Sequence, residues 1–340
     1  MTDKKKILFS AFDIGGGNAV FPVAERVSRD KKFSALLLIG GPSKEIFKKK
    51  KIKFINADLL SFRDLKDLIY DFNPDFFIGG TSAGLTFDKK ILDTLKKNGA
   101  KTIYILDYWA NYWQRFSSEK KDFRYLPDMI CVMDQKAKKE MVAEGFDPKI
   151  IKITGNPHFD HFRKIKKGDS TLILFISTPV SVKEKSGYDE FTVIEGILRV
   201  LKSGNFPSDF KVIIRPHPSE KSEKFDRYVD SGIRVDDETS IEELLSRAGL
   251  VIGMTSVVLF QAAIAGKRVI SYQPNLKSKD FSVVGEFGLG QLATGESELR
   301  DLFKKYSSGI FPESRKSFDM TVPHATGNII DMIKKYKYEK

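Results

Sequence analysis

The chain has 340 residues, of which 41% are hydrophobic and 30% charged, so extended disorder is excluded and a folded globular protein is expected. Its single cysteine, Cys131, excludes a disulfide framework and a cysteine-based zinc site. The formal net charge of +12 suits nucleic acid, an anionic membrane or a phosphorylated substrate, and equally a lysine-rich surface.

No apolar run approaches the roughly 18 residues of a membrane-spanning helix. The first apolar stretch, from Ile7, is too short for a signal peptide, so we expect a cytoplasmic protein. The sequence contains no DNA- or RNA-binding motif, and nucleic acid is not an expected partner. A peripheral contact with anionic lipid at the inner membrane face is expected in preference to nucleic acid. The chain has one dense basic run, at Lys48–Lys51.

Short apolar strands alternate with amphipathic helical stretches from end to end. In the first half the pattern predicts strands at 6–12, 35–40, 53–56, 76–79, 102–107, 129–133 and 150–154, and helices at 19–28, 65–72, 89–97 and 135–144. After a basic stretch at 163–169 it predicts strands at 171–176, 211–214, 250–252 and 268–271, and helices at 189–201, 241–248, 257–265, 296–305 and 325–337.

This alternation predicts an α/β protein with two doubly wound, Rossmann-like domains facing a cleft. We place a first domain at residues 1–165 and a second at 166–322. The last segment, 323–340, is expected to form a helix that packs back on the first domain. Ligands of such sheets bind beyond the carboxyl ends of the strands, so the loops there are candidate sites.

Besides a glycine-containing loop at Gly79–Gly84, the first domain has three candidate loops. Gly15, Gly16, Gly17 and Asn18 follow the first strand, where glycines permit close approach of a ligand or simply form a tight turn. They match neither a dinucleotide fingerprint nor a P-loop. The aromatic loop with Asp107, Trp109 and Asn111 suits stacking on a sugar or base, or packing between domains. Asp13 is a candidate general base or a turn residue, and His158, in the third loop, is a second candidate for proton transfer.

The second domain has the sharper pattern. Arg215 and His217, stiffened by two prolines, follow a strand and can bind a phosphate. Thr255 and Ser256 precede a helix, so their hydroxyls and the helix N–H groups can hold a pyrophosphate, or they act as caps. Ser177 and Thr178 form a weaker candidate of the same kind, for the nucleotide.

These residues resemble the donor-binding half of GT-B glycosyltransferases. More narrowly, they resemble the superfamily of UDP-N-acetylglucosamine 2-epimerases, CDP-glycerol glycerophosphotransferases and bacterial sialyltransferases. The resemblance is carried by Arg215-Pro216-His217-Pro218, Ser240–Ala248, Leu250–Gly253 with Thr255-Ser256, Gln261–Ile270, Gly327–Ile333 and Gly155–Asp160. In sialyltransferases an HP motif holds the nucleotide phosphate and an upstream acid is the base, which implies His217 and Asp13 for these roles.

Two residues depart from the patterns of these families. Gln261 stands where the family has a glutamate that often bonds the ribose, which opens the nucleotide preference. Gly15–Pro22 also loosely resembles the glycine loop of the peptidoglycan N-acetylglucosaminyltransferase, but Asn18 replaces its histidine and cannot act as a base.

The resemblance implies a metal-independent glycosyltransferase without a cofactor. It would transfer a sugar from a nucleotide-activated donor to a glycan or lipid-linked acceptor in surface-polysaccharide or glycoconjugate synthesis. Three alternatives stay open: a 2-epimerase or hydrolase of the same fold, a CDP-glycerol-type polyol-phosphate transferase, and a non-catalytic nucleotide-sugar-binding protein.

Overall fold

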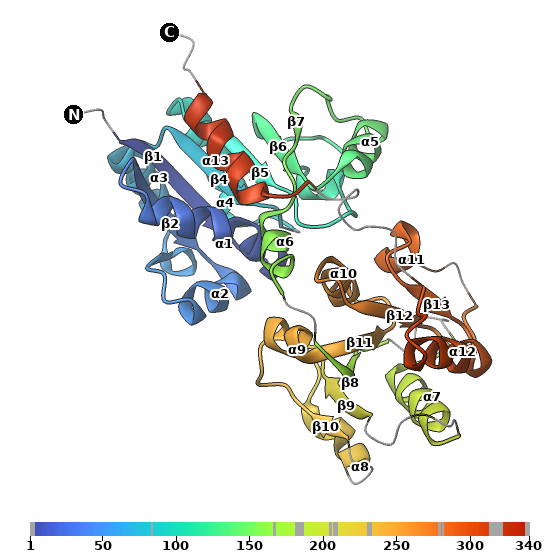
Figure 1. Cartoon of the computed structure of the whole chain (residues 1–340). Helices are drawn as coiled ribbons and strands as arrows, with labels where there is room; N and C mark the ends of the chain where they lie inside the picture. Colours follow the sequence, from blue (N-terminus) through green and yellow to red (C-terminus); the bar gives the residue numbers. More distant parts are fainter. Residues whose placement is uncertain are drawn as a thin grey trace. The chain divides into compact units, whose positions relative to one another are not determined.

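A computed structural model of the chain describes residues 4–82, 84–165, 168–180, 187–203, 206, 210–229, 233–277, 280, 282–312 and 322–336 (Figure 1). It divides into two compact units. Unit 1 consists of Met1–Asp160 and Thr321–Lys340, and unit 2 of His161–Met320. The chain therefore passes from one unit to the other twice, after Asp160 and after Met320.

Unit 1 contains a seven-stranded parallel sheet with the order β3-β2-β1-β4-β5-β6-β7. Its strands are β1 (Lys5–Ala11), β2 (Phe33–Ile39), β3 (Ile55–Asn56), β4 (Phe76–Gly80), β5 (Lys101–Ile105), β6 (Met129–Val132) and β7 (Ile151–Ile153). Its α-helices are α1 (Ile14–Arg29), α2 (Lys44–Lys49), α3 (Phe62–Phe72), α4 (Phe87–Lys97), α5 (Gln135–Ala143) and α13 (Ala325–Lys335), and α6 (Pro157–Phe162) crosses into unit 2. Short 3-10 turns are η1 (Gly41–Ser43), η2 (Ala57–Leu59) and η3 (Trp113–Arg115).

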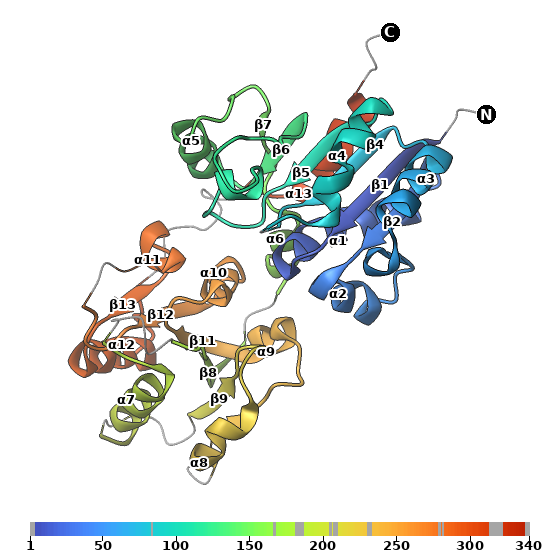
Figure 2. The same ribbon diagram turned by 180° about the vertical axis from the view of Figure 1, so that it is seen from behind.

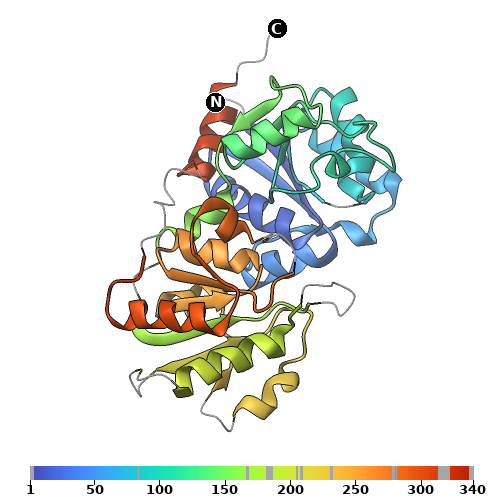
Figure 3. The same ribbon diagram turned by 90° about the vertical axis from the view of Figure 1, so that its right-hand side faces the viewer.

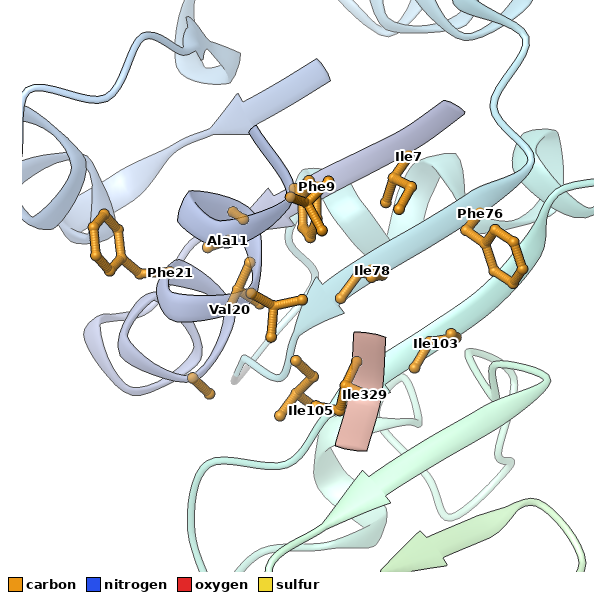
Figure 4. Packing of buried hydrophobic residues seen from close by; sticks show 14 of the residues in the cluster. Ile7, Phe9, Ala11, Val20, Phe21, Phe76, Ile78, Ile103, Ile105 and Ile329 are labelled. Carbon is orange, nitrogen blue, oxygen red and sulfur yellow. The ribbon is translucent and has the colours of Figure 1, made fainter. Parts of the chain in front are cut away.

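Alternation along β1 sends Ile7, Phe9 and Ala11 to one face of this sheet, where they pack against α1 and α13 (Figure 4). Val20 from α1 and Ile329 from α13 are buried in the same cluster. The opposite face carries α3 and α4, which lie side by side (Figure 2). Both faces are thus covered by helices, which explains why the central strands read as nearly continuous apolar runs.

Helix α13 joins this core from the far end of the chain. The carboxylate of Asp160 accepts the N–H groups of Ala325 (3.0 Å) and Thr326 (2.9 Å), so it caps the helix start. Lys5 Nζ donates to the carbonyl of Ile333 at 2.8 Å. The helix ends at Lys335, earlier than predicted, because Tyr336 already has extended backbone; Lys337 lies outside the described residues.

Unit 2 contains a six-stranded parallel sheet with the order β10-β9-β8-β11-β12-β13. Its strands are β8 (Asp169–Ile176), β9 (Lys211–Arg215), β10 (Arg234–Val235), β11 (Ala248–Gly253), β12 (Arg268–Tyr272) and β13 (Gln291–Ala293). Its helices are α7 (Glu190–Ser203), η4 (Ser222–Phe225), α8 (Asp226–Val229), α9 (Ile241–Arg247), α10 (Val257–Ile264), α11 (Val283–Phe287) and α12 (Glu296–Ser307). Helices α7 and α12 lie side by side over one hydrophobic core (Figure 3).

The predicted fold class, two doubly wound parallel sheets, is confirmed. Cys131 is fully buried, and burial raises the pKa of its thiol to about 12, which fits the inert core residue expected from the sequence. In the described part of the chain, no helix is both long enough and apolar enough to span a bilayer.

Candidate functional site

Each sheet has one place where neighbouring strands send their following loops to opposite faces. In unit 1 this switch point lies between β1 and β4, and in unit 2 between β8 and β11. Open α/β sheets bind ligands beyond the carboxyl ends of such strand pairs. The candidate residues predicted from the sequence divide between these two edges.

At the unit 2 switch point, Ile176 of β8 pairs with Gly253 of β11, so the loops that follow them start side by side. Ser177 Oγ donates to Glu220 Oε1 at 3.1 Å, so its proton is already used within the protein. Thr178 Oγ1, in contrast, is buried without a hydrogen-bond partner among the described residues. A buried unpaired hydroxyl costs free energy, about 1–3 kcal/mol, and marks a place where a ligand can bond.

Helix α10 begins directly after β11 at the same edge. Ser256 Oγ accepts the N–H of Val258 at 3.2 Å, so Ser256 is a helix cap, as one of the two sequence interpretations holds. No acidic side chain lies in the first turn of α10, which leaves its positive end open to an anion. Thr255 immediately precedes the cap and is half-buried.

Arg215 and His217 follow the neighbouring strand β9. One guanidinium nitrogen of Arg215 donates to the carbonyl of Asp236 at 2.9 Å. The ring Nδ1 of His217 accepts the N–H of Ser219 at 3.2 Å, which assigns the proton of the neutral ring to Nε2. His217 is exposed. The loops after β8, β9 and β11 leave the same edge of the sheet, and they carry hydroxyl, imidazole, guanidinium and helix N–H donors.

Two glutamates and a lysine hold these loops in place by hydrogen bonds. None of the three was predicted from the sequence. Glu220 accepts from Ser177 Oγ, from the N–H of His217 (2.7 Å) and from Lys224 Nζ (2.5 Å). Lys224 also pairs with Glu190, at the start of α7. Although burial alone would lower the pKa of Lys224, its bonds to Glu190 and Glu220 raise it. Glu220 lies four residues before Lys224, a spacing that favours such a pair.

In unit 1, Gly15, Gly16 and Gly17 were predicted to form a loop before a helix that starts near residue 19, and this is wrong. They form the first turn of α1, which begins at Ile14. A Cβ at Gly16 would lie 2.6 Å from the carbonyl oxygen of Thr81, and one at Gly15 only 1.9 Å from Asp107 Oδ2. The glycines therefore let α1 press against the ends of β4 and β5, and Asn18 follows within the helix.

Asp107 is held in a compact polar cluster at this edge. Its Oδ1 accepts from Arg115 (2.6 Å) and from Thr81 Oγ1 (2.7 Å), and the two side chains of the ion pair are only 13% and 15% exposed. Arg115 also donates to the carbonyl of Ala110 at 3.1 Å. Because its Oδ1 already accepts these two hydrogen bonds, the Asp107 carboxylate has a structural role at this edge.

Asp13 stands at the N-cap of α1, after β1, but its side chain makes no capping bond. Burial lowers the pKa of the nearby Lys89, while Asp88 and Asp13 act in the opposite direction. Lys89 Nζ donates to the carbonyls of Ser82 (3.1 Å) and Gly84 (2.6 Å) and so fixes the loop after β4. Burial raises the pKa of Asp88, which accepts from Tyr104 at 3.1 Å.

The aromatic loop after β5 packs inside unit 1. Trp109 is 7% exposed, stacks on Phe159 with centroids 5.8 Å apart, and donates from Nε1 to Asp134 at 2.7 Å. Asn111 is exposed in the left-handed conformation, with φ of +55°. The structure thus places Asn111 at the surface of this loop, Asp107 largely buried in the polar cluster, and Trp109 packed beneath the loop.

His158 and Gln261 lie on helices. His158 is the second residue of α6, a segment predicted as a loop, and its N–H bonds Asn156 Oδ1 at 3.0 Å. Asn156 in turn donates to the carbonyl of Asp107 at 3.3 Å, which ties this segment to the unit 1 edge. Gln261 is buried in the second turn of α10. No group of three or more His, Cys, Asp or Glu able to hold a metal gathers in the described residues.

No protein-family model and no curated protein sequence matches this chain. Solved structures match it over nearly its whole length. A putative UDP-N-acetylglucosamine 2-epimerase from Listeria monocytogenes gives a TM-score of 0.71 at 16% identity, covering 99% of this chain and 98% of its own.

The UDP-GlcNAc 2-epimerase from Neisseria meningitidis bound to UDP-GlcNAc gives a TM-score of 0.68 at 13% identity, covering 97% of this chain and 100% of its own. The lipopolysaccharide outer core galactosyltransferase WaaB in its apo form gives 0.56 at 13% identity, covering 97% and 99%. At these identities the likeness concerns the fold, and it confirms the resemblance at that level: this chain has the GT-B fold shared by these epimerases and glycosyltransferases.

Proposed function

We propose that this chain is an enzyme that holds a nucleotide-activated sugar at the unit 2 edge and transfers the sugar to an acceptor. The observation that carries the proposal is the buried hydroxyl of Thr178, which has no hydrogen-bond partner among the described residues, in the loop that follows the strand next to β11. The Neisseria protein of the same fold is bound to UDP-GlcNAc, which supports a ligand of this class.

The unit 2 edge suits a diphosphate. The N–H groups in the first turn of α10 and the hydroxyls of Thr178 and Thr255 are neutral donors that can surround phosphate oxygens. Arg215 keeps guanidinium donors beyond the one used on Asp236, and His217 presents Nε2–H. These groups can stabilise the charge that develops on a departing phosphate, so the proposed mechanism assigns that role to them.

The base that activates the acceptor is proposed to be Asp13. It follows β1 at the carboxyl end of the strand, at the unit 1 switch point. Asp107 is a poorer base because Arg115 and Thr81 already occupy its Oδ1. His158, on α6, remains the reserve candidate. The acceptor, a glycan or a lipid-linked molecule, is then proposed to bind near Asp13, Asp107 and Asn111.

A 2-epimerase is the second candidate, favoured by the TM-scores of 0.71 and 0.68 with epimerases, against 0.56 with WaaB. A 2-epimerase inverts the configuration at carbon 2 of the sugar and needs no acceptor. The two reactions therefore differ in whether the nucleotide sugar alone is converted.

The first experiment screens UDP, CMP, CDP and GDP by thermal shift, because a ligand that binds only the folded state raises its melting temperature. We expect one nucleoside diphosphate to protect, and the variant His217→Ala to weaken its binding about tenfold through the lost charge-assisted bond. His161→Ala, which also removes an exposed imidazole, is the matched control and should bind as the wild type does. Equal binding by both variants would remove His217 from the site.

The second experiment incubates the protein with UDP-GlcNAc alone and follows the sugar by proton NMR. Transfer predicts an unchanged sugar until an acceptor is added, when UDP is released. A new N-acetylmannosamine signal without acceptor would establish the epimerase instead. If the protein binds the nucleotide but converts the sugar with none of the acceptors, it is a non-catalytic binding protein.

A further inference from the structure

The outer edge of unit 1 exposes large apolar side chains. Leu59, at the end of η2, is 80% exposed, and Phe62, the first residue of α3, is 46% exposed. Both lie just after β3, which is the edge strand of the sheet. Such side chains on an otherwise well-packed corner indicate a surface that meets a partner with an apolar component.

The neighbouring segment, which Lys44 and Asp58 join to η2 by an ion pair, is strongly basic. Residues 44–63 contain seven Lys or Arg and two acidic side chains, a net charge of +5. Both acids are used within the segment, because Glu45 pairs with Lys48 at 2.8 Å and Asp58 with Lys44 at 2.5 Å. The exposed side chains of Lys49, Lys50, Lys51 and Lys53 therefore keep their charge for an anionic partner.

The corner is held by regular structure. Phe47 of α2 is buried in the core of unit 1, and the capping box of Ser61 and Asp64 fixes the start of α3. Asp58 also accepts the N–H of Gly41 at 3.0 Å, which ties η2 to η1, the turn that leads into α2. Figure 2 shows α2, β2 and α3 together along one side of unit 1.

We propose that this basic edge, defined as Lys48–Lys51, Lys53, Leu59 and Phe62, binds the surface of an anionic lipid bilayer. Lysine ammonium groups are attracted to anionic headgroups, and leucine and phenylalanine insert at the boundary of headgroups and acyl chains. Charge alone would also suit RNA, and Phe62 could stack on an unpaired base, but the exposed aliphatic side chain of Leu59 has no such role. The combination selects the membrane.

The position of the edge fits a membrane-held substrate. Leu59 follows β3 at the carboxyl end of the unit 1 sheet, and Asp13 follows β1 at that same end. The proposal goes beyond the reaction proposed above and does not depend on it, because binding to vesicles needs neither nucleotide nor acceptor.

The test is co-sedimentation of the full chain with vesicles of phosphatidylcholine, alone or mixed with phosphatidylglycerol. We expect binding only to the anionic vesicles, weakening as salt is added. Lys48→Glu with Lys49→Glu should lower the partition coefficient by about tenfold or more. Lys304→Glu with Lys305→Glu is the matched control, since this pair also ends a helix and also includes an i,i+3 ion pair, with Asp301.

The apolar contribution is tested by Leu59→Ser, which should weaken vesicle binding about fivefold. Its control is Ile310→Ser, a residue 70% exposed in unit 2, which should leave binding unchanged. The proposal is overturned if both lysine pairs weaken binding equally, or if Leu59→Ser has no effect. It is also overturned if single-stranded RNA binds the basic edge and the anionic vesicles do not.

Discussion

The two switch points have the same topology but use their polar groups differently. At the unit 1 edge, Asp107, Arg115 and Thr81 satisfy one another, and glycines let α1 close over them. At the unit 2 edge, Thr178 Oγ1 is buried without a partner among the described residues, and the start of α10 carries no acid. One edge is stabilised by its own contacts, and the other keeps donors for a ligand.

The largest loss of stability is expected when the ion pair of Arg115 and Asp107 in unit 1 is broken. Arg115→Met leaves Asp107 largely buried without its cation, and should lower the free energy of unfolding by about 3 kcal/mol. Both tryptophans of the chain, Trp109 and Trp113, lie in unit 1, so tryptophan fluorescence in urea reports this unit.

Arg29→Met is the control for this measurement. Its guanidinium pairs with Glu25 at the surface, where it is 73% exposed, and its loss should cost less than about 0.5 kcal/mol. Equal urea midpoints for the two variants would contradict the structural role given to Arg115.

The glycines of α1 give the next largest effect. Alanine normally favours a helix over glycine by about 1 kcal/mol. At Gly16, however, its Cβ would meet the backbone oxygen of Thr81, so Gly16→Ala should destabilise unit 1 by about 2 kcal/mol. Gly327→Ala, in open space within α13, should instead stabilise by about 0.5–1 kcal/mol. If both variants gain stability in urea, the close packing of α1 on β4 is wrong.

A smaller effect is expected in unit 2, where burial lowers the pKa of Lys267 to about 8. In the unfolded chain this group titrates near 10.4, so between about pH 8 and pH 10 the unfolded state binds more protons and stability rises with pH. Lys267→Met should therefore stabilise at pH 7 by about 1–2 kcal/mol, with an advantage that fades above pH 8. Calorimetry at pH 7 and pH 10 checks this, and a gain equal at both pH values would contradict it.

Much of the fold could be predicted because apolar runs and helical periodicity are local signals. The central strands and the longer helices lie within a few residues of their expected positions. The two-residue strands β3 and β10 offer little pattern, and β10 and the short α2 were missed. At the start of α1, glycine's usual meaning as a turn residue was overridden by packing against Thr81 and Asp107, which no local rule reveals.

The candidate residues of unit 2 could be found because loops after parallel strands converge at one edge. Their chemistry could not be ranked from the sequence. Ser177 and Thr178 look equivalent there, yet Ser177 Oγ donates to Glu220, and Thr178 Oγ1 has no partner among the described residues. Glu220 and Lys224 also join segments that are far apart in the sequence, at Ser177 and Glu190. Only their own spacing of four residues could have indicated that they pair. Trp109 could equally have been exposed or packed, and only the contact with Phe159 decides.

The central claim is that the unit 2 edge holds the phosphates of a nucleotide, and Thr178 tests it most directly. Thr178→Val removes a buried hydroxyl that has no described partner, so the free protein should be as stable as the wild type or slightly more so. Its affinity for the protecting nucleotide, measured by calorimetric titration, should fall about fivefold to tenfold.

Thr102→Val provides the contrast, because its hydroxyl bonds Asp128 at 2.7 Å in unit 1. It should lose about 1 kcal/mol of stability and keep full nucleotide affinity. The two variants should therefore respond oppositely: Thr178→Val loses nucleotide affinity and keeps its stability, whereas Thr102→Val loses stability and keeps its affinity. A Thr178→Val protein that binds the nucleotide as tightly as the wild type would contradict the assignment of the phosphate site.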